Sequence, residues 1–89
     1  MVQDMTVPAG FEDLVKFAKW DLPTADERYR IRREATVQEL KEFYDGVLPH
    51  LEAILDECDK YPLGDLPESH QGIFNIALSM AEIAPHIEF

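Results

Sequence analysis

Cysteine is almost absent from this chain: Cys58 is the only one among 89 residues, so no internal disulfide can form. The residue falls among the apolar positions of the segment 36–60. In such a place a cysteine is either a small buried hydrophobe or a reactive thiol. Glycine is also scarce. The four glycines are isolated from one another, and no glycine-rich phosphate-binding loop is present.

Long hydrophobic runs are missing as well. The longest mostly apolar stretch, Ile73 to Ile87, contains Asn75, Ser79, Glu82 and Pro85. It is too short to span a bilayer, which takes about 20 apolar residues. The N-terminus lacks the positively charged region and apolar run of a signal peptide. We therefore expect a cytoplasmic protein without a membrane partner.

Positive charge is nearly absent from the second half. Residues 45–89 hold nine acidic residues against Lys60 alone, whereas residues 1–44 hold nine against seven Lys and Arg. The chain carries a net charge of −10 at pH 7. Nucleic acids and anionic membranes are bound through Lys and Arg, so this charge argues against both as partners. The acidic surface either keeps the protein soluble or faces a basic protein partner.

A helical period dominates what is present. From Leu40 to Cys58, apolar residues alternate at spacings of three and four, as in a helix that buries one face. Thr36, with Glu39 three residues later, has the pattern of a capping box that begins this helix. Pro49 lies inside it and cannot donate a backbone hydrogen bond. Because the apolar spacing continues through the proline, we expect one long kinked helix that ends near Lys60.

Three further helices are expected, over about 11–19, from 24 onward, and from about 66 to 84. Thr24 and Glu27 repeat the capping-box pattern. The arginines that follow them resemble a phosphate-binding patch in isolation, but acidic neighbours favour intramolecular ion pairs. The predicted fold is all-α, a compact four-helix antiparallel bundle with a kinked long third helix. Residues 1–9 are expected to form a flexible N-terminal arm, and residues 10–89 a single helical domain.

The last helix has more apolar surface than a small bundle can cover. Its apolar residues span roughly 220° of the helical wheel, against about 100° for a surface helix. Either it is the central helix, or a second chain covers it. This predicts a candidate interface, and a two-fold homodimer is the commonest closed assembly. The candidate residues are Phe17, Trp20, Phe74, Leu78 and Ala81. Alternatively, Trp20 covers the core of the bundle.

Catalytic, cofactor-binding and metal-binding residues are all expected to be absent. The nearest approach to a metal motif is Glu82 with His86, one turn apart, and zinc requires three or four ligands. No serine or cysteine has an evident base in the sequence. Carboxylates such as Glu52 and Asp56 fall on the outward face of the long helix, where they stay solvated and ionised.

Two stretches resemble a family of small bacterial proteins. They are the run Trp20 to Tyr29, with its Trp-Asp-Leu-Pro-Thr start, and the pair formed by Phe43-Tyr44-Asp45 and Tyr61-Pro62-Leu63-Gly64-Asp65-Leu66-Pro67. The chain resembles uncharacterised bacterial all-α proteins that tend to be encoded beside aromatic-ring-hydroxylating dioxygenases. The resemblance covers most of residues 11–89 and implies an accessory role in aromatic or terpenoid catabolism, without implying any catalytic residue.

Two functions follow as hypotheses. The first is a non-enzymatic accessory or protein-interaction domain, associated with aromatic-compound catabolism, that binds a protein partner or a second copy of itself. The alternative is a helical domain that binds a small apolar ligand or acts as an enzyme. Its pocket would lie near the Pro49 kink and be lined by Tyr44, Leu48 and Phe74. The first is favoured because no set of polar residues converges on that apolar lining.

Overall fold

All regular structure in the computed structural model is helical, over the residues 5–88 that it describes. The α-helices are α1 (Ala25–Glu34), α2 (Val37–Val47), α3 (Leu51–Cys58) and α4 (Glu68–Glu88). Three 3-10 helices accompany them: η1 (Glu12–Trp20), η2 (Leu48–His50) and η3 (Leu63–Asp65). The all-α prediction is confirmed. Over these residues no helix combines the length and apolar character that crossing a membrane requires.

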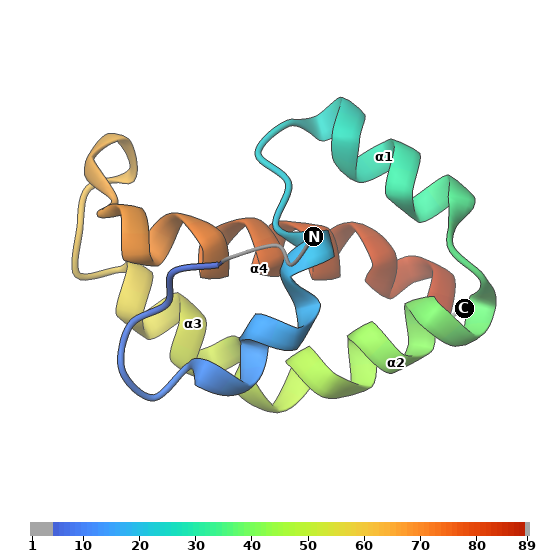
Figure 1. Ribbon diagram of the computed structural model, residues 1–89, viewed down its shortest axis with the longest axis horizontal. Helices are drawn as coiled ribbons and strands as arrows, with labels where there is room; N and C mark the ends of the chain where they lie inside the picture. Colours follow the sequence, from blue (N-terminus) through green and yellow to red (C-terminus); the bar gives the residue numbers. More distant parts are fainter. Residues whose placement is uncertain (1–4, 89) are drawn as a thin grey trace.

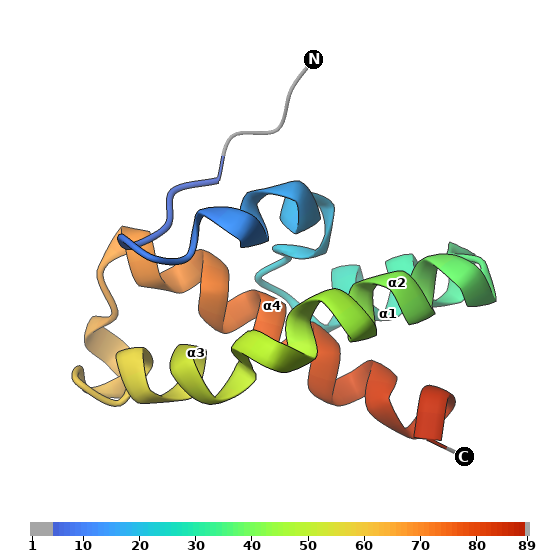
Figure 2. The same ribbon diagram turned by 90° about the horizontal axis from the view of Figure 1, so that it is seen from below.

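The last helix, α4, is the centre of the bundle. In Figure 1 it runs the length of the molecule, with α2 and α3 along one side of it and α1 on the other. Seen at right angles in Figure 2, η1 lies over α4, and its Phe17 and Trp20 rings also contact Phe43 of α2. Three isoleucines of α4 are fully buried and face the core together with Phe43, Val47 and Ile54; they are Ile73, Ile76 and Ile83. The radius of gyration is 12.5 Å.

Threonine caps begin two of the helices, as the sequence predicts. At Thr36 the capping box is complete: its hydroxyl accepts the Glu39 amide at 3.1 Å, and the Glu39 carboxylate accepts the Thr36 amide at 3.0 Å. At Thr24 only half of the box forms. The hydroxyl accepts the amide of Glu27 at 3.2 Å. At Thr24 one hydrogen bond therefore caps the start of α1, whereas the capping-box pattern predicted two.

Pro49 divides the long helix into two α-helices. The chain stays helical from Val37 to Cys58, but the 3-10 turn η2 separates α2 from α3. Phe43 and Val47 before the turn and Ile54 and Cys58 after it are all buried, so the apolar stripe keeps its phase through Pro49. Leu48 is nevertheless 47% exposed, although the α-helical period placed it on the buried face. Leu55, also expected on that face, is 46% exposed.

The first helix differs from its prediction in type. Residues 12–20 form the 3-10 helix η1, interrupted at Phe17, whose backbone angles (φ −102°, ψ 21°) are not helical. Leu14 and Ala18 are buried as expected, while Val15 is exposed. The apolar spacing of this segment fits either helix type, because both place residues three apart on a similar face.

Residues 5–9 are the described part of the expected N-terminal arm, and two of them contact the bundle. Met5 is buried, and Val7 packs against the core. A β-carbon added at Gly72 would lie 3.0 Å from Cε of Met5, which shows how closely this methionine covers α4. Residues 1–4 lie outside the described part of the chain.

Candidate functional site

The strongest candidate site is an apolar strip on the outer edge of α4, formed by Phe74, Leu78 and Ala81; we call it the α4 strip. The three residues are four and three positions apart and so share one edge of the helix. Phe74 and Leu78 are half-buried and Ala81 is exposed, whereas Ile73 and Met80 on the neighbouring face are buried. The bundle therefore covers α4 on its core face and leaves this edge partly open.

A hollow lies at the N-terminal end of the α4 strip. It measures about 240 Å³ and is lined by Phe74, Pro23, Gly64, Leu66, Gln71 and Asn75. A second hollow of about 310 Å³ adjoins it, since both share Pro23, Gln71 and Asn75. The second adds the carboxylates of Asp21 and Glu68, so polar groups dominate its walls. Asp21 is already held there, because its Oδ1 accepts Nδ2 of Asn75 at 2.9 Å.

The three residues expected to line a pocket near Pro49 lie in different surroundings. Leu48 points to solvent from the end of α2, and Tyr44 packs against the core. Phe74 lines the hollow beside Pro23 instead. Leu48 follows the buried Val47 and lies about 100° from it around the helix, so the packing of Val47 in the core leaves Leu48 at the open edge.

The two aromatic residues of η1 were both predicted to be interface residues, and the structure gives them different surroundings. Trp20 is a core residue, 2% exposed, and its ring stacks on Phe43 with centroids 4.4 Å apart. Its carbonyl accepts the Ser79 hydroxyl at 3.0 Å, which fixes η1 to α4. This burial removes Trp20 from the interface and confirms its alternative core role. Phe17 is half-buried, edge-on to Phe43 at 5.5 Å, and lies over Gly46.

An ion-pair cluster fixes α1 to α4. Arg28 is 8% exposed; its Nε lies 3.2 Å from Oε1 of Glu82, and its Nη1 donates to the carbonyl of Leu22 at 3.0 Å. Arg32 adds a contact of 3.3 Å to the same carboxylate oxygen. The expected intramolecular pairing thus holds for these two arginines. It also occupies Glu82, the residue that the sequence paired with His86 as a partial metal motif.

A second polar cluster joins the end of α3 to the start of α4. His70 is buried, with its Nε2 3.0 Å from Oε1 of Glu57 and its Nδ1 2.9 Å from the hydroxyl of Ser69. Lys60 contacts the other oxygen of Glu57 at 3.0 Å, and the Tyr61 ring lies edge-on to the imidazole at 4.9 Å. The hydrogen bond from His70, followed by that from Lys60, lowers the pKa of Glu57.

This cluster corrects the expectation that no serine has a nearby base. The contact between His70 and Glu57 forms only in the folded chain, because Glu57 lies thirteen residues before His70. None of the hollows described above is lined by Ser69 or His70. The arrangement satisfies a buried imidazole and closes the α3–α4 hairpin, as buried polar groups require.

The lone thiol is also structural. Cys58 is 8% exposed at the end of α3. Burial, followed by the charges of Glu57 and Asp59, raises the pKa of its thiol. A reactive thiol needs a lowered pKa, so Cys58 acts as a small buried hydrophobe. Over the described residues no three or more His, Cys, Asp or Glu side chains gather as a metal site.

Comparison with known proteins found no matching family model, no matching curated protein and no matching solved structure.

Proposed function

We propose that this chain is a non-enzymatic accessory domain that acts by binding protein, and that the α4 strip is the contact face of a two-fold homodimer. The observation that carries the proposal is the incomplete covering of Phe74 and Leu78 on the central helix of the bundle. Contiguous apolar surface that a subunit leaves open is typical of an interface.

The chemistry of the strip suits self-association. A two-fold axis that passes between Ala77 and Leu78 would place Phe74 of one copy opposite Ala81 of the other, a large side chain against a small one. The strip itself carries no charge. Glu82, which lies four residues after Leu78, is already neutralised by Arg28 and Arg32. Electrostatic repulsion between two copies is therefore smaller at this face than the net charge of the whole chain suggests.

The accessory role rests on the resemblance to proteins encoded beside ring-hydroxylating dioxygenases. In that setting, the homodimer would present its remaining surfaces to a component of an aromatic-compound oxygenase system. The two polar clusters support a binding role over a catalytic one, because each closes on itself: His70 with Glu57, and Arg28 with Glu82.

Sedimentation equilibrium tests the homodimer. Wild type is compared with Leu78→Glu, which places a charge on the strip, at about 0.02 M and 0.3 M salt, where screening lengths differ several-fold. The matched control is Val37→Glu, since Val37 is 79% exposed and lies on α2, off the strip. Circular dichroism on each variant confirms that it is folded.

We expect wild type and Val37→Glu to form dimers that tighten at the higher salt, because screening reduces repulsion between acidic subunits. Leu78→Glu should remain monomeric under both conditions. A monomeric wild type at high micromolar concentration in both salts would overturn the homodimer. Equal association of wild type and Leu78→Glu would show that another face is used.

A further inference from the structure

A second apolar face is exposed on α3 and the bend before it. Leu48 is 47% exposed and Leu55 is 46% exposed, while Leu51 between them is half-buried against the core. We call these three residues the α3 strip. Their spacing of three and four residues is that of the a and d positions along one seam of a coiled coil. Two leucines exposed this far leave a seam that a further helix can cover.

Carboxylates border the α3 strip, and they do not form ion pairs among the described residues. Asp45, Glu52 and Asp59 each lie three or four residues from Leu48 or Leu55, and therefore beside them on the helical surface. All three are exposed, and within residues 5–88 none of them forms a side-chain hydrogen bond or an ion pair. The one basic residue of the second half, Lys60, is occupied by Glu57. The border of this strip is thus a row of unpaired negative charge.

From this pairing of exposed leucines with unpaired carboxylates we infer that the α3 strip binds a cationic amphipathic helix of another protein. Apolar residues of that helix, three and four apart, would cover Leu48 and Leu55. Its flanking Lys or Arg side chains would meet Asp45, Glu52 and Asp59, as complementary charges do beside a coiled-coil seam. The inference rests on the proposed function only in treating the chain as an interaction domain; it concerns a different face.

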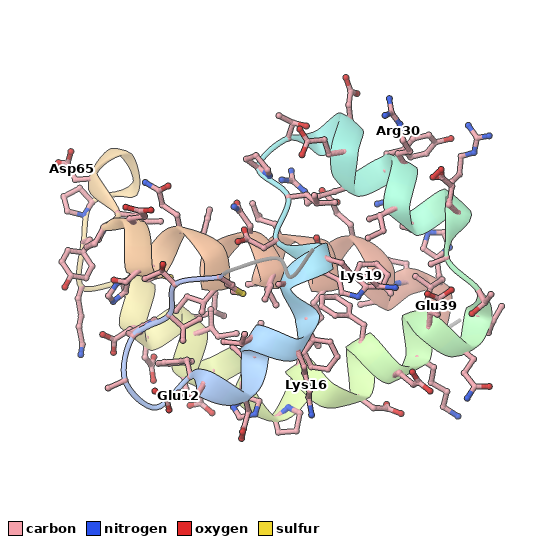
Figure 3. The ribbon with its side chains drawn as sticks, viewed as in Figure 1. Glu12, Lys16, Lys19, Arg30, Glu39 and Asp65 are labelled. Carbon is pink, nitrogen blue, oxygen red and sulfur yellow. The ribbon has the colours of Figure 1, made fainter. Side chains whose placement is uncertain are left out.

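A second copy of this chain fits the α3 strip less well. Two α3 strips brought together would oppose their own carboxylates, which lie beside the leucines. The outer side of α1 does carry exposed arginines, among them Arg30, which points away from the body in Figure 3. Its only large exposed apolar side chain is Tyr29, so it offers one anchor where the strip has two leucines to cover.

The probe is a synthetic helical peptide of about fourteen residues, two heptads, with leucine at a and d and lysine at e and g. Its binding to the full chain is followed by fluorescence anisotropy at low salt. A second peptide has the same composition in scrambled order, which removes the seam but keeps the charge. A third carries glutamate in place of lysine.

Four protein variants accompany the peptides. Leu55→Ser and the double substitution Glu52→Gln with Asp59→Asn alter the α3 strip and its border. Val37→Ser is the control for an exposed apolar residue elsewhere, and Leu78→Ser is the control for the α4 strip. All altered side chains are exposed or half-buried, and circular dichroism on each variant checks that it is folded.

We expect the patterned lysine peptide to bind wild type about tenfold more tightly than the scrambled peptide, and the glutamate peptide not to bind. Leu55→Ser should weaken binding about fivefold or more, from the loss of an apolar anchor. The double substitution should weaken binding and reduce its dependence on salt. Val37→Ser and Leu78→Ser should bind the peptide as wild type does.

Equal binding of the patterned and scrambled peptides would overturn the inference, since it would mean unspecific attraction of charge. So would unchanged binding by Leu55→Ser. If Leu55→Ser lowers self-association of the protein and leaves peptide binding unchanged, the strip is a contact between copies and the inference is wrong. The homodimer is tested separately, by sedimentation of wild type and Leu78→Glu. Its failure would not change the peptide result.

Discussion

The ring of Phe17 lies directly over the bare backbone of Gly46, where a β-carbon would overlap the ring atom Cζ. This contact joins η1 to α2, and it explains a glycine in the interior of a helix. Phe17 also has the non-helical backbone angles that interrupt η1, and its ring meets Phe43 edge-on. The break in η1 and the glycine in α2 are two parts of one packing arrangement.

Gly46→Ala should therefore destabilise the protein. In an open helix this change gains about 1 kcal/mol of helix propensity. Here the added carbon must displace the Phe17 ring, and overpacking costs about 1–3 kcal/mol. In a Phe17→Leu background the obstruction is smaller, so the same change should stabilise. Urea denaturation of wild type, Gly46→Ala, Phe17→Leu and the double variant measures the change in stability in each background. Stabilisation by Gly46→Ala in both backgrounds would contradict the contact.

Arg28→Ala should cost about 1.5–3 kcal/mol in free energy of unfolding, the usual range for hydrogen bonds to charged groups. The change leaves the Leu22 carbonyl without its donor and leaves Glu82 with Arg32 alone. Arg30→Ala is the matched control on the same helix, because Arg30 is exposed, and its effect should stay within about 0.5 kcal/mol. Similar denaturation midpoints for the two variants would show that the cluster does not hold α1 in place.

The carboxyl group of Glu39 should titrate far below its ordinary range. Hydrogen bonding from Lys19 and then from the Thr36 amide lowers its pKa from 4.5 to about 2. Lys19 and Glu39 lie side by side in Figure 3, with Nζ 2.7 Å from Oε2. Because the pKa is lowered in the folded state, its contribution to stability is present above about pH 4.5. That contribution is lost as the pH falls from there towards 2.

A carbon-detected NMR titration of Glu39 measures this pKa directly. Lys19→Met should raise it towards 4.5, with part of the lowering retained through the Thr36 amide. Lys16→Met is the control, since Lys16 lies on the same helix η1 and contacts the Phe17 ring instead. A Glu39 pKa near 4.5 in wild type would refute the contact.

Neighbouring residues on α3 should respond very differently to truncation. Ile54 is fully buried, so Ile54→Ala should cost about 2–5 kcal/mol. Leu55 is 46% exposed, and Leu55→Ala should cost less than about 1 kcal/mol. Denaturation midpoints measure both changes. A large loss on truncating Leu55 would mean that the α3 strip is covered within the chain.

Much of the fold was predictable because its signals are local. Thr36 and Glu39 lie within one helical turn, and the spacing of Ile73, Ile76 and Ile83 marks a buried face wherever the helix packs. These features depend on residues three or four apart, and the sequence shows such spacings directly.

The candidate sites depend on contacts that are distant in sequence. Arg28 and Glu82 are 54 residues apart, and no local pattern selects that partner from the other carboxylates. Periodicity also shows which residues share a face without showing how much of it is covered. Leu48 and Leu55 were therefore assigned to the buried face, and only the packing of the folded chain reveals that they are exposed.

The α4 strip as a contact between two copies is tested most directly by an isotope-filtered NOE experiment. The sample mixes equal amounts of ¹³C-labelled and unlabelled protein at moderate salt, so that every cross-peak in the filtered spectrum joins two different chains. We predict cross-peaks between the methyl groups of Leu78 and the ring protons of Phe74. Cross-peaks that arise only from other residues, or none at a concentration where sedimentation detects dimer, would contradict the proposed interface.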